Sequence, residues 1–353
     1  MSSRNSGAAD RSGGRSRTVT AVVTAGLLVA GAALALLLVW PRILGAERIL
    51  GVAQLIAFRA PLALGLATVA LVALVGGATA VLLRRRAPGL RRGVGVLAIV
   101  AALAAAGNLT VLLVRGAAES GTAGLRDGEL TVLVWNTQGG ASSPADVAEL
   151  VLATGADVVS LPEMDDEAAA EVARRVTVEG IPMTAATTSA VAETSTSSWI
   201  PTSLLVADSL GAYRLDATAG TTRGLPSGVW RPVDGTGPVI VAAHPAAPLT
   251  DGMDDWRAGL DWIHAQCRAL GPELILAGDL NATVDHLDLG GCRDAAVEAH
   301  AAATGTWPST APAWLASPID HVLVGSAWHV REVRVVDATG GTDHRALVAV
   351  LVR

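Results

Sequence analysis

The segment Leu-Ile-Leu-Ala-Gly-Asp-Leu-Asn occupies residues 274–281 and joins an apolar run directly to two polar side chains. A short continuous apolar run of this kind is typical of a strand buried inside a domain. Asp279 and Asn281 follow at the point where such a strand would end. Taken alone, Gly-Asp-Leu-Asn is also a common turn sequence. The same arrangement elsewhere in the chain distinguishes the two explanations.

Polar residues stand at the ends of several other apolar runs. Asn136 follows the run 130–135, Glu163 follows 157–161, and His244 follows 239–243. Two further pairs, Asp320 with His321 and Asp343 with His344, open apolar runs near the end of the sequence. Strand ends gather along one edge of a sheet, where binding sites form. We expect strands over 130–135, 157–161, 203–207, 239–243, 274–277, 319–324 and 347–352, helices over 144–153, 165–176, 256–270 and 293–304, and a Ser/Thr-rich loop over 187–202.

The first third of the chain has a different composition. Residues 18–40, 60–83 and 93–114 are apolar runs without a charged residue, and Asn108 is the one strongly polar residue in the third run. About 20 apolar residues span a bilayer as a helix. One such run could be a buried helix or, at the N-terminus, a signal peptide, but three in succession indicate three transmembrane helices over 18–115.

Charge divides the chain at the same place. The whole chain is 51% hydrophobic and only 16% charged, whereas a soluble domain has about 25% charged residues. All 26 basic residues are Arg; residues 1–115 carry a net charge of +11 and residues 116–353 a net charge of −17. We expect a membrane region, a Gly/Ala-rich linker over 116–129 and one α/β domain over 130–353.

Arginine counts predict the orientation in the membrane. The N-terminus, residues 1–17, has four Arg, and the loop 84–92 has five. Because cytoplasmic loops are enriched in Arg and Lys, both should be cytoplasmic, which places the domain after the third helix outside the cell membrane. The loop 41–59 has three Arg and contains the short apolar stretch Ile49–Phe58, which we expect at the membrane interface.

The polar residues at the strand ends suit the hydrolysis of phosphate esters. Glu163 and Asp343 offer the carboxylate oxygens that a hard divalent cation binds. Asp279 could act as the base for an attacking water. Asn281, His344 and His244 could donate hydrogen bonds to a developing negative charge. A His in this role is usually oriented by a carboxylate, for which Asp320 is the candidate.

Each of these residues also has an ordinary structural explanation. Asn136 could form a turn, Glu163 could be solvated, and His244 could simply pack beside Pro245. His321 lies inside a strand pattern and is better explained as structural than as catalytic. The other four histidines have no partner pattern, so we expect them at the surface: His264, His286, His300 and His329.

The ordered set of motifs resembles the endonuclease/exonuclease/phosphatase superfamily of DNase I-like nucleases, sphingomyelinases and inositol-phosphate phosphatases. The resemblance covers roughly 130–353 and implies a four-layer α/β/β/α sandwich with the site at one end of the two sheets. The motifs that carry it are Val-Leu-Val-Trp-Asn136, Ala-Asp-Val-Val-Ser-Leu-Pro-Glu163, Val-Ala-Ala-His244-Pro, Leu-Ala-Gly-Asp279-Leu-Asn281, Ser-Pro-Ile-Asp320-His and Gly-Thr-Asp343-His344.

The resemblance also implies roles for the matching residues. Glu163 corresponds to the Mg²⁺ ligand, with Mn²⁺ as the alternative ion. Asn136 helps to order the metal site, and Asp343 is the acidic residue near it. The remaining matches imply a water-positioning or deprotonating role for Asp279 and phosphate contacts for Asn281, for His344 with its partner Asp320, and for His244.

The substrate class is narrowed by charge and location. A domain at −17 without Lys is poorly suited to nucleic acid, whose binding depends on Lys and Arg. Tethering outside the membrane favours a lipid-linked phosphate, and three membrane helices followed by this domain also resemble VanJ-type glycopeptide-resistance membrane proteins, which implies a lipid pyrophosphate such as undecaprenyl pyrophosphate. The alternatives are a surface-tethered nuclease, a phospholipase C-like phosphodiesterase and a non-catalytic membrane-binding module. No protein partner is inferred.

The two cysteines, Cys267 and Cys292, are 25 residues apart. An extracytoplasmic location permits a disulfide. Two free, partly buried thiols are the alternative. A metal site is not indicated, because the chain has no Cys-x-x-Cys pattern.

Overall fold

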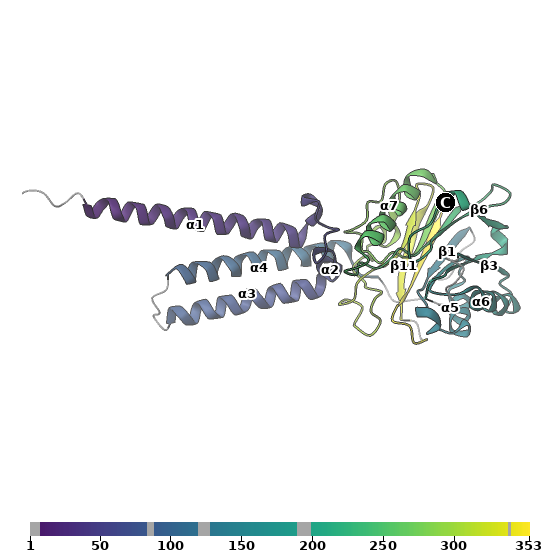
Figure 1. Cartoon of the computed structure of the whole chain (residues 1–353). Coiled ribbons are helices and arrows are strands. Elements are labelled where there is room, and N and C mark those ends of the chain that lie inside the picture. The colour runs from purple at the N-terminus through teal and green to yellow at the C-terminus, as the bar shows by residue number, and fades with distance from the viewer. Residues whose placement is uncertain (1–7, 83–87, 119–127, 189–198, 338–339) are drawn as a thin grey trace, which may run out of the picture. The chain divides into compact units, whose positions relative to one another are not determined.

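The computed structural model divides into two compact units, a helical unit (1–47 and 60–110) and an α/β unit (48–59 and 111–353). Elements are labelled as in Figure 1. The residues that the structure describes are 8–82, 88–118, 128–188, 199–337 and 340–353.

Three long helices lie among the described residues of the first third of the chain, which confirms the three apolar helices expected there. They are α1 (Ala8–Val39), α3 (Arg59–Leu82) and α4 (Pro88–Arg115), with a short 3-10 helix, η1 (Pro41–Leu44), after the first. Each contains a segment long and apolar enough to cross a membrane, with mean hydropathy of 2.6, 2.1 and 2.3 in chain order. The polar Asn108 is buried, and its amide donates to the carbonyl oxygens of Ala104 (2.9 Å) and Leu38 (3.2 Å). Its hydrogen-bonding groups are thus satisfied inside the helical unit, as an apolar environment requires.

Two six-stranded sheets form the centre of the α/β unit. The first has the order β11-β12-β1-β2-β4-β3 and the second β5-β6-β7-β8-β10-β9. The first sheet comprises β1 (Glu129–Val134), β2 (Val158–Pro162), β3 (Met183–Thr188), β4 (Thr202–Ala207), β11 (His329–Val336) and β12 (Ala346–Val352). The second comprises β5 (Tyr213–Leu215), β6 (Gly228–Pro232), β7 (Val239–Ala243), β8 (Leu274–Asp279), β9 (Arg293–Asp294) and β10 (Asp320–Val324).

Helices cover the outer face of each sheet (Figure 1). Helices α5 (Pro144–Thr154) and α6 (Asp166–Val178) bury apolar side chains with β1, β2 and β4. Helix α7 (Met253–Ala269) buries Trp256, Leu260 and Ile263 with β7 and β8. A third apolar cluster, which includes Trp230, fills the space between the sheets. The expected four-layer α/β/β/α sandwich is therefore confirmed.

The strand directions explain why the polar residues meet. Strands β1 and β2 are parallel in the first sheet, and β7 and β8 are parallel in the second. The residues that follow each pair consequently lie at the same end of the sandwich. Strand β10 runs antiparallel to β8 with Asp320 directly opposite Asp279. The beginning of one strand thus supplies a carboxylate to the end of another.

The structure corrects two sequence-based expectations. The expected helix 293–304 is mostly absent: after β9 there is only the short α8 (Ala295–Glu298), and the chain turns at His300, where φ is 53°. The sequence also did not predict β3, β5, β6 or β11, which are edge or near-edge strands with little apolar character. The expected loop 187–202 falls largely on 189–198, outside the described residues.

The stretch Ile49–Phe58 was expected at the membrane interface, and that expectation stays a prediction. It contains a short helix, α2 (Val52–Ala57), and belongs to the α/β unit. Ala53 and Ile56 are 1% and 0% exposed. These two side chains are therefore packed against protein, whereas Ile49, Leu50 and Leu55 are about half-exposed.

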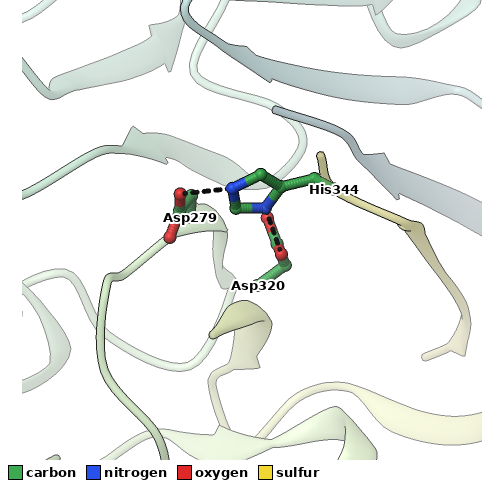
Figure 2. A group of neighbouring side chains, drawn as sticks. All are labelled: Asp279, Asp320 and His344. Atoms are coloured by element: carbon green, nitrogen blue, oxygen red, sulfur yellow. Dashed lines mark hydrogen bonds and ion pairs between the residues drawn. The ribbon is translucent and has the colours of Figure 1, made fainter. Parts of the chain in front are cut away.

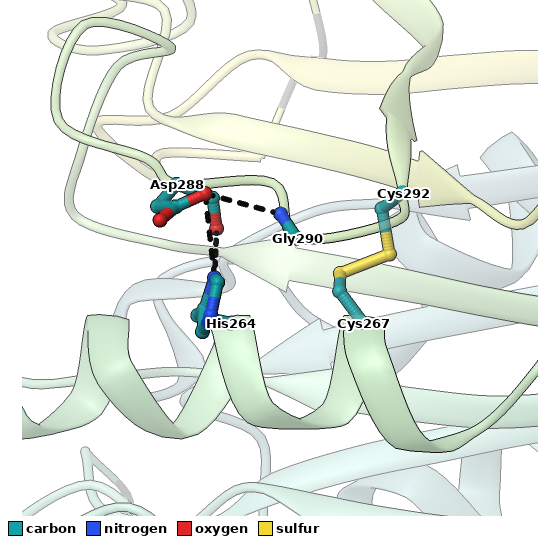
Figure 3. The surroundings of a disulfide bond; sticks show 5 residues. All are labelled: His264, Cys267, Asp288, Gly290 and Cys292. Atoms are coloured by element: carbon teal, nitrogen blue, oxygen red, sulfur yellow. Dashed lines mark hydrogen bonds and ion pairs between the residues drawn. A yellow bond between two sulfur atoms is a disulfide. The ribbon is translucent and has the colours of Figure 1, made fainter.

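A disulfide joins Cys267, late in α7, to Cys292, with 5.3 Å between the two Cα atoms. Figure 3 shows the neighbouring loop: a ring nitrogen of His264 lies 3.1 Å from the carbonyl oxygen of Asp288, and the Gly290 amide donates to the Asp288 carboxylate (3.2 Å). Of the two alternatives left open for the cysteines, the structure has the disulfide. It fixes the segment after β8 to the helix that covers the second sheet.

Candidate active site

Asn136 connects the two sheets at the polar end of the sandwich. Its amide nitrogen donates to Glu163 Oε1 (3.0 Å) and to Asp279 Oδ2 (3.0 Å). Its oxygen accepts from the backbone N–H of Gln138 (2.9 Å). Asn136 therefore orients two carboxylates that come from different sheets.

Glu163 is held in an unusual backbone conformation. Its φ is 60°, which is rare for a residue other than Gly and costs conformational energy. The Thr137 hydroxyl donates to the Glu163 carbonyl oxygen (2.7 Å), which fixes this turn. Residues in such conformations concentrate at functional sites.

His344 lies between two carboxylates, as Figure 2 shows. Its Nδ1 is 2.9 Å from Asp320 Oδ2, and its Nε2 is 3.6 Å from Asp279 Oδ2. Burial by itself would lower the pKa of His344, but the charges of Asp320 and Asp279 outweigh it and raise the pKa to about 9. The ring is therefore an imidazolium at neutral pH, with both nitrogens as donors.

Asp279 is buried at the centre of the cluster. Burial, followed by the charge of Asp320, raises the pKa of the Asp279 carboxyl. Its Oδ1 accepts from the backbone N–H of Asn281 (2.8 Å). A carboxylate made more basic in this way is a stronger proton acceptor than an exposed Asp.

In contrast to His344, His244 has a lowered pKa. It is 1% exposed, and burial lowers its pKa to about 4, so the ring is neutral at physiological pH. Its Nε2 lies 3.9 Å from both Glu163 Oε1 and Asp279 Oδ2. Its Nδ1 has no hydrogen-bond partner among the described residues. His244 is thus a neutral ring available to a bound group.

Asn281, unlike His244, is bound to neighbouring backbone and side-chain groups. Its φ is 47°, its amide nitrogen donates to the carbonyl oxygen of Pro245 (3.1 Å), and its own carbonyl oxygen accepts from the Trp256 indole (2.9 Å). These bonds hold the turn after β8. The amide nitrogen carries a second N–H, which can donate to a ligand while the first stays bonded to Pro245.

The donor set fits a hard divalent cation. Glu163 Oε2 is buried and has no hydrogen-bond partner among the described residues, and burial raises the pKa of this carboxyl to about 7. Asp343 Oδ2 accepts from the Trp307 indole (2.8 Å), and its Oδ1 is 4.0 Å from His344 Nε2. A cation bound by Glu163 and Asp343 would offset the unfavourable burial of negative charge.

A second group with metal-ligand spacing comprises Asp279, Asp320 and His344, whose ligand atoms all lie within 4.8 Å of one another. Hydrogen bonds explain this group without an ion, because both ring nitrogens of His344 face carboxylates. Glu163 Oε2 differs from this group, because it is buried and has no hydrogen-bond partner among the described residues.

One cavity of about 370 Å³ contains nearly the whole predicted site. Asp320 does not line it and lies behind His344 as the partner of that ring. The predicted residues that line the cavity are Asn136, Glu163, His244, Asp279, Asn281, Asp343 and His344.

The sequence reasoning missed the other residues of this cavity. Gln138 accepts from the Asp343 N–H through its side-chain oxygen (2.9 Å), and Trp307 positions the Asp343 carboxylate. Phe58 and Trp199 contribute aromatic surface. Gln138 could have been found by its distance of two residues from Asn136. The aromatic residues carry no polar pattern that sequence reasoning could use.

Two of the remaining histidines are buried. His321 is structural, as expected: its Nδ1 lies 2.6 Å from Asp294 Oδ2 and its Nε2 lies 2.8 Å from the Ala282 carbonyl oxygen. The expectation that His286 is at the surface was wrong, because it is 2% exposed. Its Nε2 lies 3.1 Å from the carbonyl oxygen of Ala53, in the segment that connects α1 and α3.

The sequence and the fold are similar to those of known proteins. The model of the Endonuclease/Exonuclease/phosphatase family matches residues 133–344. Similar solved structures include humanized TDP2 from D. rerio (14% identity, TM-score 0.49, covering 64% of this chain and 100% of that one). A mannosyl-6-phosphatase from Bacteroides thetaiotaomicron is also similar (14% identity, TM-score 0.48, 64% and 100% coverage). So is an endonuclease/exonuclease/phosphatase from Beutenbergia cavernae (17% identity, TM-score 0.48, 64% and 71% coverage). A search of curated proteins gave no match.

Proposed function

Because the chain belongs to the endonuclease/exonuclease/phosphatase family of phosphoester hydrolases, we propose that it is a membrane-anchored, extracytoplasmic, Mg²⁺-dependent phosphoesterase that hydrolyses a lipid-linked phosphate or pyrophosphate. The residues that line the cavity are the observation that supports a lipid-linked substrate. Among the described residues that line it, none is Arg or Lys, and much of the wall away from the carboxylates is apolar. A groove for nucleic acid needs basic side chains along its length. An amphiphile with one phosphate head fits this lining better.

The polar residues would divide the chemistry among themselves. Glu163 and Asp343 would hold the Mg²⁺, which when bound polarises a phosphoryl oxygen and offsets its negative charge. Asp279, made more basic by burial, accepts a proton from the attacking water.

Charge on the phosphoryl oxygens is stabilised by donors. The imidazolium of His344, fixed in orientation by Asp320, donates from Nε2. His244 contributes a neutral ring, and Asn281 contributes its amide. Asn136 keeps Glu163 and Asp279 in register.

Two features support the extracytoplasmic location. The Arg-rich N-terminus and the Arg-rich loop 84–92 favour the cytoplasm, which leaves the α/β unit on the other side after three helices. The disulfide between Cys267 and Cys292 is the form expected in an oxidising compartment.

The test is hydrolysis by the full-length protein purified in detergent. Undecaprenyl pyrophosphate and plasmid DNA are offered side by side, with Mg²⁺ or with EDTA. We expect Mg²⁺-dependent phosphate release from the lipid, its loss in Asp279→Asn, and its retention in Asp294→Asn, a substitution in the other buried Asp–His pair. Cleavage of DNA with untouched lipid would refute the proposal and favour a surface nuclease.

A further inference from the structure

The segment Arg48–Arg59, which connects α1 to α3, is built into the α/β unit by contacts with residues about 190 or more positions away in sequence. Gln54 Nε2 donates to the Pro248 carbonyl oxygen (2.5 Å), and His286 Nε2 donates to the Ala53 carbonyl oxygen (3.1 Å). Arg48 donates to the carbonyl oxygen of His286 (2.9 Å). Ala53 is almost fully buried. These contacts fix the position of the segment relative to the sandwich.

A buried carboxylate strengthens this attachment. Asp285 accepts two hydrogen bonds from Arg59 (2.8 and 2.6 Å) and two from Arg115 (2.9 and 2.7 Å). Although burial would raise it, these hydrogen bonds hold the pKa of Asp285 well below its usual range. Arg59 is the first residue of α3 and Arg115 is the last residue of α4. The chain therefore enters one membrane helix and leaves another at residues bound to the same carboxylate.

The end of the segment lines the active-site cavity. Ala57 and Phe58 form part of its wall, together with Trp307 and Leu249. The rings of Phe58 and Trp307 have centroids 5.9 Å apart, tilted by 53°. Trp307 in turn donates to Asp343, one of the carboxylates at the polar end. A continuous surface thus runs from the phosphate site to an aromatic residue directly before α3.

We infer that the Arg48–Arg59 segment is a substrate-specificity element, in which Phe58 and Trp307 hold the part of an apolar chain nearest the phosphate of a lipid-linked substrate. This inference rests on the proposed phosphohydrolase function and identifies the part of the protein that selects an amphiphile. Phe58 directly precedes Arg59, the first residue of a helix that is long and apolar enough to cross a membrane. The carboxylates at the other end face the head group. Contact with an aromatic side chain removes apolar surface of the substrate from water.

The experiment uses the full-length protein in detergent with a series of substrates that share one head group: dimethylallyl, geranyl and farnesyl pyrophosphate. We expect kcat/KM to rise with chain length in the unmodified protein. In Phe58→Ala we expect about a tenfold loss for the farnesyl substrate and less than a twofold loss for the dimethylallyl substrate, and Phe58→Leu should recover most of the loss. The matched control is Leu55→Ala, which removes an exposed apolar side chain of the same segment that does not line the cavity. Activity on the shortest substrate reports that each variant is folded.

Each outcome bears on the inference in one direction. A chain-length preference that Phe58→Ala flattens, and Leu55→Ala leaves intact, supports it. Equal rates along the series in the unmodified protein, or an equal loss on all three substrates in Phe58→Ala, overturns the specificity role and leaves the phosphohydrolase function standing. Hydrolysis of none of the three, with cleavage of DNA, overturns the proposed function together with this inference.

Discussion

The pairing of His344 with Asp320 makes a quantitative prediction about pH. The two side chains are 6% and 0% exposed, and Nδ1 lies 2.9 Å from the carboxylate. With a pKa of about 9, His344 is about 97% protonated at pH 7.5. Asp320→Asn removes the nearest charge, so burial, which lowers the pKa of a His, is opposed only by Asp279 and Asp343. Because one nearby opposite charge shifts a pKa by about 2, the pKa of His344 should fall to about 7 and the protonated fraction at pH 7.5 to about 24%.

The assay is the pH dependence of kcat/KM for a soluble phosphate ester, measured from pH 5.5 to 10. If protonated His344 donates to the phosphate, the alkaline limb should move from near pH 9 to near pH 7, and activity at pH 7.5 should fall about fourfold. At saturating Mg²⁺, the activity of the variant relative to that of the unmodified protein should recover toward the acid side, because lowering the pH restores the proton on His344.

The matched control is Asp294→Asn, which removes the carboxylate from the buried pair with His321 in the same sheet. It should leave the alkaline limb in place. An alkaline limb that stays near pH 9 in Asp320→Asn would refute the reasoning, since the proton would then not depend on this carboxylate.

Three further predictions concern the metal, the disulfide and a buried ring. Protons compete with a cation for Glu163, whose pKa is about 7, so the Mg²⁺ concentration that gives half-maximal activity should rise about tenfold per unit of pH below 7. In Glu163→Gln, Mg²⁺ should bind more weakly and this dependence on pH should disappear. If the dependence persists in the variant, Glu163 is not the metal ligand. Replacing Cys267 and Cys292 by Ser opens a 25-residue loop and should lower the free energy of unfolding in urea by about 3.5 kcal/mol; no difference from the unmodified protein would contradict this. His286 has a pKa of about 4 in the folded protein, so it binds a proton more weakly there than in the unfolded chain. Its contribution to stability is therefore complete above about pH 6.5, and about 3 kcal/mol of stability is lost as the pH falls toward 4. The test is the difference in the free energy of unfolding in urea between the unmodified protein and His286→Gln, which should shrink over that pH interval.

Much of the fold could be read from local patterns. The three membrane helices are set by uninterrupted apolar length, and the central strands by short apolar runs, because both signals reflect burial of every side chain in the element. Edge strands such as β11 were missed, since their side chains are half-buried and include charged groups that pair locally. The helix expected over 293–304 failed for a similar reason: the β9 strand pairs with β10, and that tertiary pairing overrides local propensity.

The sequence by itself determined which polar residues gather at one end of the sandwich, because they follow apolar runs in an order that the family shares. It did not determine their protonation. Burial gives Asp279 and Glu163 raised pKa values and His244 a lowered one, whereas Asp320, placed opposite Asp279 by strand pairing, makes His344 a cation. Only tertiary structure decided that Phe58 reaches the same cavity, because its contacts lie roughly 190 to 250 residues away along the chain. Local sequence encodes element type and chemical group, whereas electrostatic environment and cavity shape depend on which distant segments pack together.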